Sequence, residues 1–365
     1  MLEIKSNIIL KKIIQFTNYK ILLQTIKYNK KIQKKIDISI EDYKKYNQIE
    51  FEIKPRYNCG KICLNYKEDL KAFMHFSIND DENYKDEIII NNLEHPIRKI
   101  KIVIDPEIKS LKGLFKNSKY IDELICIKFN RKNITDMSEM FYGCDNLRNL
   151  DIFNFNTDNV INMSYMFYKC KSLYIINLFH FNTSKVINMQ NMFDQCSNLL
   201  ELNIKNFDTS NVIYLNDIFY NCKNLRSIDI SQFRIDNAIN MSYMFYNCKS
   251  LKTLDNFNFC NNKVTDISYI FHNCSSIKKI DMNNMDTSNV TNMSNMFYGC
   301  SNLINLDISN FVINDNCRTK NMFFDCNDDL KNKIKQKLKT INEIIFEDNE
   351  IDDKSVFEED DWTNE

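Results

Sequence analysis

The sequence predicts a repeat solenoid of the α/β class, with one short parallel strand and one short helix per 26-residue repeat and helical caps at both ends. Phenylalanine and cysteine recur together eight times at this interval, with no insertion between copies. A period of about 20 to 50 residues is typical of stacked repeats, whose neighbours bury one continuous core. The pairs are Phe141 and Cys144, Phe167 and Cys170, Phe193 and Cys196, Phe219 and Cys222, Phe245 and Cys248, Phe271 and Cys274, Phe297 and Cys300, and Phe323 and Cys326.

The strand half of each repeat is seen in the segment from Leu147 to Phe155, LRNLDIFNF. Its apolar residues follow the pattern L-x-x-L-x-L-x-x-aromatic, and side chains that alternate in this way line one face of a strand. In one copy Asn256 occupies an inward position, where we expect a bulge or an inward turn of Phe257.

The second half of each repeat is seen in NVINMSYMFYKC, which ends at Cys170. Met163, Met166, Phe167 and Cys170 have the i, i+3, i+4, i+7 spacing of one helix face. Asn162 or Ser164 is a suitable helix cap, because its side-chain oxygen can accept an unpaired amide. We therefore expect about two helical turns in each repeat.

The first copy of the repeat is degenerate, because Ser118 stands where later copies have cysteine. Phe115 still occupies the phenylalanine position, which brings the number of phenylalanine-anchored units to nine. Further upstream, Ile100, Ile102 and Ile104 alternate and predict one more strand. We place the array at residues 97–327.

The unit from Asn289 to Phe311, NVTNMSNMFYGCSNLINLDISNF, resembles the BspA-like leucine-rich repeat family. The matching signatures are N-M-S-x-M-F-x-x-C, L-x-x-L-D-I-S-x-F and F-D-T-S-N-V, and FDTSNV itself begins at Phe207. The resemblance implies a leucine-rich-repeat solenoid with no catalytic residues. Bacterial members are surface or secreted proteins implicated in adhesion, and this chain is more similar to members from protists and large viruses that have no signal peptide.

The flanks of the array predict four further units. Residues 1–50 carry 11 lysines against 5 acids and form a helical N-terminal module, and residues 51–96 form a mixed linker and cap. The segment from Ile8 to Gln33 loosely resembles an F-box. A capping helix over residues 328–346 begins at Asn327 or Asp328, and residues 347–365, with ten acids and one lysine, form a disordered tail.

Composition limits the function classes. The net charge is −1 and no apolar run reaches the ~18 residues of a membrane span, so we expect neither a nucleic-acid nor a membrane partner. Lys11 and Lys12 interrupt the first apolar run, which differs from a signal peptide, so we expect the cytoplasm. We interpret the periodic cysteines as buried thiols, although their spacing is compatible with disulfides. We expect no enzyme, cofactor or metal, because no phosphate loop, nucleophile–base set or ligand cluster is present.

The candidate binding face is the exposed side of the predicted concave sheet. Asp and Asn predominate at its central outward position, and they either bond the turn backbone or form an acidic face for a basic partner. Phe153, Phe179 and Phe257 are predicted as exposed aromatic anchors. The residues of this row are Ile125, Asp151, Asn177, Asn203, Asp229, Asp255, Asp281 and Asp307.

These observations favour a non-enzymatic scaffold that recognises another protein. One alternative is a ubiquitin-ligase substrate adaptor that docks through its N-terminal helices. The other is a surface adhesin exported by an unconventional route.

Overall fold

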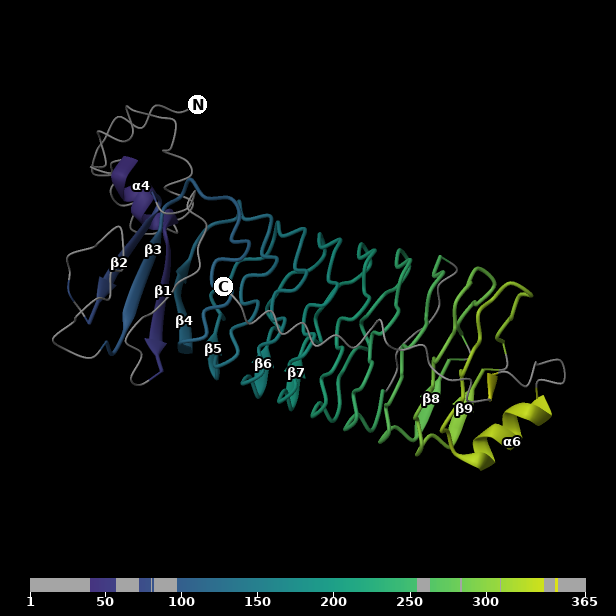
Figure 1. The fold of residues 1–365 in the computed structure, drawn as a ribbon. Coiled ribbons are helices and arrows are strands. Elements are labelled where there is room, and N and C mark those ends of the chain that lie inside the picture. Colours follow the sequence, from purple (N-terminus) through teal and green to yellow (C-terminus); the bar gives the residue numbers. More distant parts are fainter. Residues whose placement is uncertain are drawn as a thin grey trace, which may run out of the picture.

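The computed structural model is an elongated stack of similar coils with a cap at each end (Figure 1). It describes residues 40–56, 72–79, 81, 97–254, 263–282, 284–308, 310–337 and 345–346. In this view the coils follow one another with little curvature, so the strand side is a nearly flat face rather than the concave one we predicted. A chain of buried apolar side chains runs through all the coils as a single core.

Within the described residues, the N-terminal cap consists of one helix and three antiparallel strands. Helix α4 (Ile40–Asn47) precedes β1 (Ile49–Pro55), which pairs antiparallel with β3 (Ile100–Ile104) and with β4 (Ile121–Phe129). Strand β2 (Met74–Ile78) pairs antiparallel with the other edge of β3. The strand predicted at residues 100–104 therefore exists, but it belongs to the cap and not to the parallel array. Residues 1–39 of the predicted helical N-terminal module lie outside the described residues.

The strand side of the array begins where β4 pairs in parallel with β5, so the cap sheet and the first coils share one sheet. Two further parallel pairs follow, β6 with β7 and β8 with β9. Each pair is offset by 26 residues, as Asp281 opposite Asp307 illustrates. This confirms the periodic short parallel strands. The short strands are β5 (Asn149–Asp151), β6 (Ile175–Asn177), β7 (Glu201–Asn203), β8 (Lys279–Asp281) and β9 (Asn305–Asp307).

The helix predicted in each repeat is wrong, because the segment from Met163 to Cys170 is a series of tight turns. In an α-helix each amide donates to the carbonyl four residues earlier. Here successive amides donate either to a carbonyl of the next coil or to the carbonyl three residues earlier. The amide of Phe167 donates to the carbonyl of Met192 in the next coil at 2.9 Å, and that of Tyr168 donates to Tyr165 at 3.2 Å. Asn162 bonds the start of the turns, accepting from the Ser164 amide at 3.0 Å, but caps no helix. The architecture is thus strand and turn, with few helices.

Backbone dihedrals explain why no helix forms. Tyr165 and Lys169 both have φ near the left-handed region, at 57° and 58°, which is incompatible with a right-handed helix. The equivalent positions of other coils share this conformation, and Gly143 and Gly299 occupy one of them. Asn117 Oδ1 lies 2.3 Å from where a Cβ on Gly143 would stand, so a larger residue at 143 would require the Asn117 side chain to move.

A stack of phenylalanine rings forms the centre of the core, and we call it the phenylalanine ladder. It runs from Phe115 to Phe323, one ring per coil, with neighbouring ring centroids 5.3 to 5.8 Å apart. Phe51 of β1 meets the first ring edge-on at 5.3 Å, and Phe346 stacks on the last ring at 5.8 Å. The ladder thus joins both caps to the array.

The eight periodic cysteines are buried free thiols, as predicted. Each Sγ donates to the carbonyl of the ladder phenylalanine one coil earlier, as Cys248 does to Phe219 at 3.2 Å. The same bond recurs at 3.0 to 3.2 Å in the other coils. Burial raises the pKa of these thiols well above the ordinary value, so they stay protonated as donors.

The C-terminal cap confirms the predicted helix start. Asn327 Oδ1 accepts the Asp329 amide at 2.9 Å, the bond of an N-cap, and helix α6 spans Asp328–Lys337. Leu330 and Ile334 of α6 are buried against the core. Ile345 and Phe346, which we placed in the same helix, instead form a short segment on the last coil, where the Phe323 amide donates to the Ile345 carbonyl at 2.9 Å.

Replacing Phe219 by alanine should destabilise the fold by about 3 to 5 kcal/mol, because its fully buried ring contacts rings on both sides. The loss should appear as unfolding of the neighbouring coils, since repeats contact only their neighbours. Chemical denaturation measures the change. Phe153→Ala is the control, because that ring is largely exposed, and equal stability of wild type and Phe219→Ala would contradict the ladder.

The thiols of the eight periodic cysteines should resist a thiol-labelling reagent in the native protein and react fully after unfolding. The half-buried Cys317 serves as an internal reference for reactivity in the folded state. Site-resolved mass spectrometry gives the extent of labelling at each position. Rapid native labelling of the whole set would show that the coils open far more readily than their burial implies.

Candidate functional site

The predicted row of Asp and Asn side chains exists and runs along the strand face. The pairs Ile125 with Asp151 and Asn177 with Asn203 lie in register on neighbouring strands. Asp151, Asp229 and Asp281 are exposed and Asp307 is half-buried. The acids are not one cluster, because Asn177 and Asn203 separate Asp151 from Asp229 along the row. Asp255 and Phe257 lie outside the described residues.

Two aspartates of this row bond the backbone just after them, as one of our two interpretations expected. The Phe153 amide donates to Asp151 Oδ1, and the Ser231 amide donates to Asp229 Oδ1, both at 3.1 Å. Hydrogen bonds from Ser231 lower the pKa of Asp229, so its carboxylate stays charged at neutral pH. Asn177 repeats the pattern with the amide of Phe179 at 3.4 Å. The row therefore shapes the turns and also presents negative charge.

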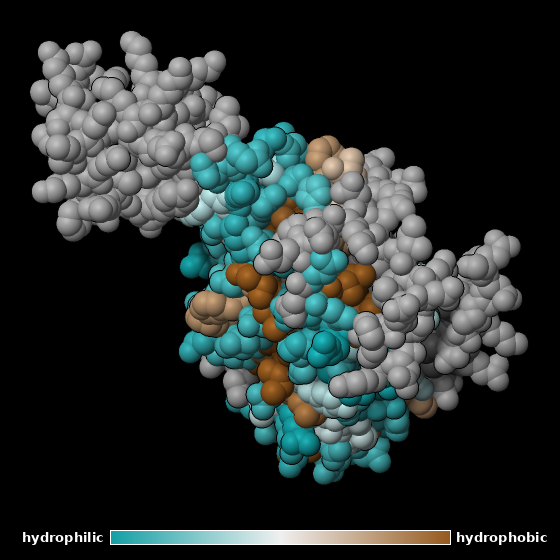
Figure 2. All heavy atoms as spheres, turned by 90° about the vertical axis from the view of Figure 1, so that its left-hand side faces the viewer, coloured by the Kyte–Doolittle hydropathy of each residue, from teal (hydrophilic) through white to brown (hydrophobic). Residues whose placement is uncertain are grey.

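Apolar side chains flank the row on both sides within the first coils. Phe153 and Phe179, predicted as exposed anchors, are 62% and 41% exposed, with ring centroids 6.3 Å apart. On the other side lie Tyr174, Ile175 and Leu200, of which Ile175 is 59% exposed. These five residues form what we call the strand-face patch. Figure 2 shows the surface at the cap end of the array as mainly hydrophilic with separate hydrophobic areas.

Three of the five residues of this patch were not predicted from the sequence. Tyr174, Ile175 and Leu200 look like ordinary apolar residues of a strand. Their outward direction is seen only in the folded structure, where β6 pairs with β7. Tyr174 and Leu200 directly follow buried Leu173 and Leu199, whereas Ile175 lies two residues after Leu173, where strict alternation would place it inward.

Two hollows on the strand face meet at Ile175. One has a volume of about 510 Å³ and is lined by Arg148, Asp151 and Tyr174 among others. The second, of about 640 Å³, includes Leu200 and Asp229 in its lining. Both are shallow surface features lined by apolar, polar and charged residues together, which suits a macromolecular surface better than a small metabolite.

Basic side chains also occupy the strand face, which the sequence reasoning did not note. Arg226, Lys252 and Lys278 stand one coil apart at the same exposed position of the repeat, and exposed Lys279 follows Lys278. The later coils thus carry a basic row close to the acidic one. Opposite charges near each other reduce the repulsion that we expected among the aspartates alone.

The described residues contain no group of three or more His, Cys, Asp and Glu side chains placed to hold a metal ion. In the same part of the chain no helix is long and apolar enough to cross a membrane.

The turn side carries a second set of perturbed groups. The residue after each ladder phenylalanine is aromatic in most coils, and these rings stack, as Tyr220 does on Tyr246 at 4.6 Å. Asp194 takes this position in one coil, where it is 5% exposed and accepts from Asn191 at 2.8 Å. Burial raises the pKa of Asp194 well above its usual value, and the nearby Asp217 carboxylate raises it further.

Asp217 has a different position in the turn, and burial raises its pKa to about 6. In the same row of coils, burial lowers the pKa of His272 to about 4, and this ring lies between those of Tyr246 and Tyr298. Neutral side chains are therefore favoured along this side of the array. The equivalent position to Asp217 is asparagine in other coils, including Asn191 and Asn295.

Replacing Asp217 by asparagine should stabilise the protein at pH 7 by about 1 to 3 kcal/mol. Below about pH 4 the Asp217 carboxyl is protonated in both the folded and the unfolded protein, so it does not lower the free energy of unfolding. As the pH rises through about 6, the unfolded protein loses this proton more easily than the folded one, and the free energy of unfolding falls. The stability difference between variant and wild type should therefore grow over this window and vanish toward pH 4. Denaturation at a series of pH values measures it, with the exposed Asp315→Asn as control. A difference that does not change with pH would contradict the proposed burial.

Comparison with protein-family models gives one family. The model described as "Mycoplasma protein of unknown function, DUF285" matches residues 109–201, 174–279 and 254–341. These matches cover almost two thirds of the chain and coincide with the parallel coils, beginning after β3. The chain therefore belongs to the DUF285 family, whose repeat here has the 26-residue phenylalanine and cysteine period. No curated protein matches the chain.

Proposed function

We propose that this member of the DUF285 family is a non-enzymatic scaffold that binds another protein through the strand face of its array. The observation that carries the proposal is the strand-face patch, in which Phe153 and Ile175 keep about three fifths of their surface exposed. Exposed apolar side chains that gather on one face are typical of protein interaction sites, and aromatic residues among them are frequent anchors.

The setting of the patch supports a protein partner. Its residues stand on strands that are held in register by the neighbouring coils, so they are presented on a rigid surface with little loss of entropy on binding. Between the two apolar groups, Asp151, Asn177 and Asn203 offer acceptors for hydrogen bonds. A partner that places basic side chains between apolar ones fits this arrangement, which keeps our proposal of a basic partner.

The relationship to BspA-like leucine-rich repeats belongs to the same proposal. Its support is the repeat motif from Asn289 to Phe311 and the parallel strands that this motif forms. The support for the proposed cytoplasmic location is the first apolar run, which Lys11 and Lys12 interrupt.

Replacing Phe153 and Ile175 together by serine should abolish or strongly weaken partner binding while the fold stays intact, because both side chains are exposed. Affinity purification from the native cell, with wild type and variant quantified side by side, identifies proteins that depend on the patch. Titration of a recovered protein then measures the change, expected to be at least about tenfold.

The matched control is Ile161→Ser with Ile187→Ser. These side chains are 43% and 40% exposed and lie in a different position of the coil, near the bridges between Asn162 and Asn188. A partner that binds the patch variant as tightly as wild type, or that is lost only from the control, would place the interaction elsewhere. Asp151→Lys with Asp229→Lys tests the basic partner, whose binding should also weaken as salt rises.

A further inference from the structure

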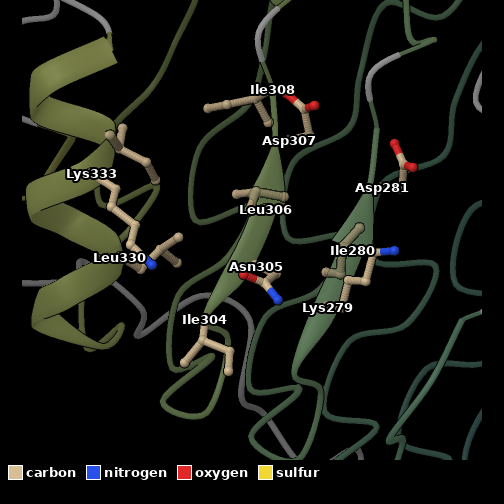
Figure 3. A pocket seen from close by; sticks show the side chains of 11 residues that line it. Lys279, Ile280, Asp281, Ile304, Asn305, Leu306, Asp307, Ile308, Leu330 and Lys333 are labelled. Carbon is tan, nitrogen blue, oxygen red and sulfur yellow. The ribbon is translucent and has the colours of Figure 1, made fainter.

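A cavity of about 570 Å³ lies at the C-terminal end of the array, between α6 and the strands β8 and β9 (Figure 3). Ile280, Leu330 and Ile334 form part of its lining and are themselves buried in the core. Ile304 stands at its edge and is 46% exposed. Helix α6 therefore covers the last coil without filling the space above the strands, and the volume is in the range of ligand pockets.

The charges around the cavity are arranged by side. Lys333 from α6 and Lys279 from β8 lie on opposite sides, whereas Asp281 and Asp307 lie together toward one end of the two strands (Figure 3). Lys279 continues into the exposed basic row of Lys278 and Lys252. An occupant that enters between the two lysines, away from Asp281 and Asp307, meets positive charge first. Such an occupant needs a large apolar group preceded by carboxylates.

The chain itself carries a segment of this chemistry close by. Phe346 lies on the last ring of the ladder, and the Lys335 Nζ is 4.9 Å from its ring centroid, one residue beyond cavity-lining Ile334. Residues 347–365 continue from there with ten acids and one lysine, and four consecutive acids, Glu358 to Asp361, directly precede Trp362. The sixteen residues from Glu347 to Trp362 follow Phe346. When extended they reach about 50 Å, far beyond the roughly 15 Å length of α6.

We propose that the acidic tail folds back on its own chain, with the indole of Trp362 in this cavity and the carboxylates of Glu358 to Asp361 against Lys279 and Lys333. A tryptophan buries about 150 to 250 Å² of surface, which the apolar lining can receive. The tether keeps the tail at an effective concentration in the millimolar range, so that a contact of modest intrinsic affinity is largely formed. The docked tail covers the C-terminal end of the strand face and leaves the strand-face patch open.

Trp362 is the only tryptophan of the chain, so its fluorescence reports on the tail without any label. We would measure acrylamide quenching and the emission maximum of the full-length protein, with a synthetic peptide of residues 347–365 as the exposed reference. The docked indole should be quenched at least about threefold less than the peptide and should emit at shorter wavelength. Added salt should raise the quenching, because it screens the lysine–carboxylate contacts.

Two variants of the cavity test its location. Lys279→Glu with Lys333→Glu reverses the two positive charges that line the cavity, and Ile304→Glu places a carboxylate at its apolar edge. Each should bring the quenching of Trp362 to the value of the peptide. The matched control, Lys223→Glu with Lys249→Glu, makes the same change in net charge at exposed positions outside the cavity and should leave the quenching unchanged. Circular dichroism verifies that every variant is folded.

Three results would overturn the proposal. Native quenching equal to that of the peptide would show that the indole is exposed. A shielded indole that does not respond to either cavity variant would place the tail elsewhere. Shielding that disappears on dilution would assign the tail to a second copy of the chain rather than to its own cavity.

Discussion

The register between neighbouring coils is the constraint on which the rest of the structure depends. Phe219 illustrates it, because its ring stacks on those of Phe193 and Phe245 while its amide donates to Met244 and its carbonyl accepts from the Cys248 thiol. All these partners lie 25 to 29 residues away in the sequence, so one inserted residue would break all of these contacts at once. The buried threonines obey the same rule, since Thr209 accepts from the Arg234 amide and donates to its carbonyl, both at 2.8 Å. The 26-residue spacing is uninterrupted because each coil depends on these hydrogen bonds and ring contacts with its neighbours.

Much of this fold follows from the sequence, and its main error has a physical reason. The period, the buried strand positions and the free thiols were predicted correctly from spacing and residue type. The helix was not, because apolar residues at i, i+3, i+4 and i+7 face one way in a row of tight turns as they do in a helix. Tyr165 and Lys169 give no hint of a left-handed backbone. The position of Lys169 does indicate this backbone when it is compared across all copies. Asn221, Asn247 and Gly299 occupy it in other coils, and these residue types adopt the left-handed conformation most easily.

The candidate site was predicted in part for a related reason. Alternation along one strand was enough to place Asp151 and Phe153 outside, because their neighbours Ile152 and Phe155 are buried. The apolar residues Tyr174 and Ile175 follow Leu173 directly, and within a single copy they are hard to distinguish from core residues. The pairing of Ile175 with exposed Glu201 shows that this position faces solvent in both coils. The acidic pair of Asp194 and Asp217 required the folded environment, since burial rather than residue type sets its pKa values.

The different orientations of the two terminal rings have a consequence for how the molecule behaves at high concentration. A stack of identical coils with bare ends would accept the end coil of another molecule and grow into a filament, as open sheet edges do. Phe51 closes the first end at 87° to the ladder, an orientation that a further coil cannot match. At the other end the Ile345 carbonyl and the Phe346 ring occupy the place of the next coil without providing another repeat behind them. Growth is thus stopped at both termini, and the array has a defined length.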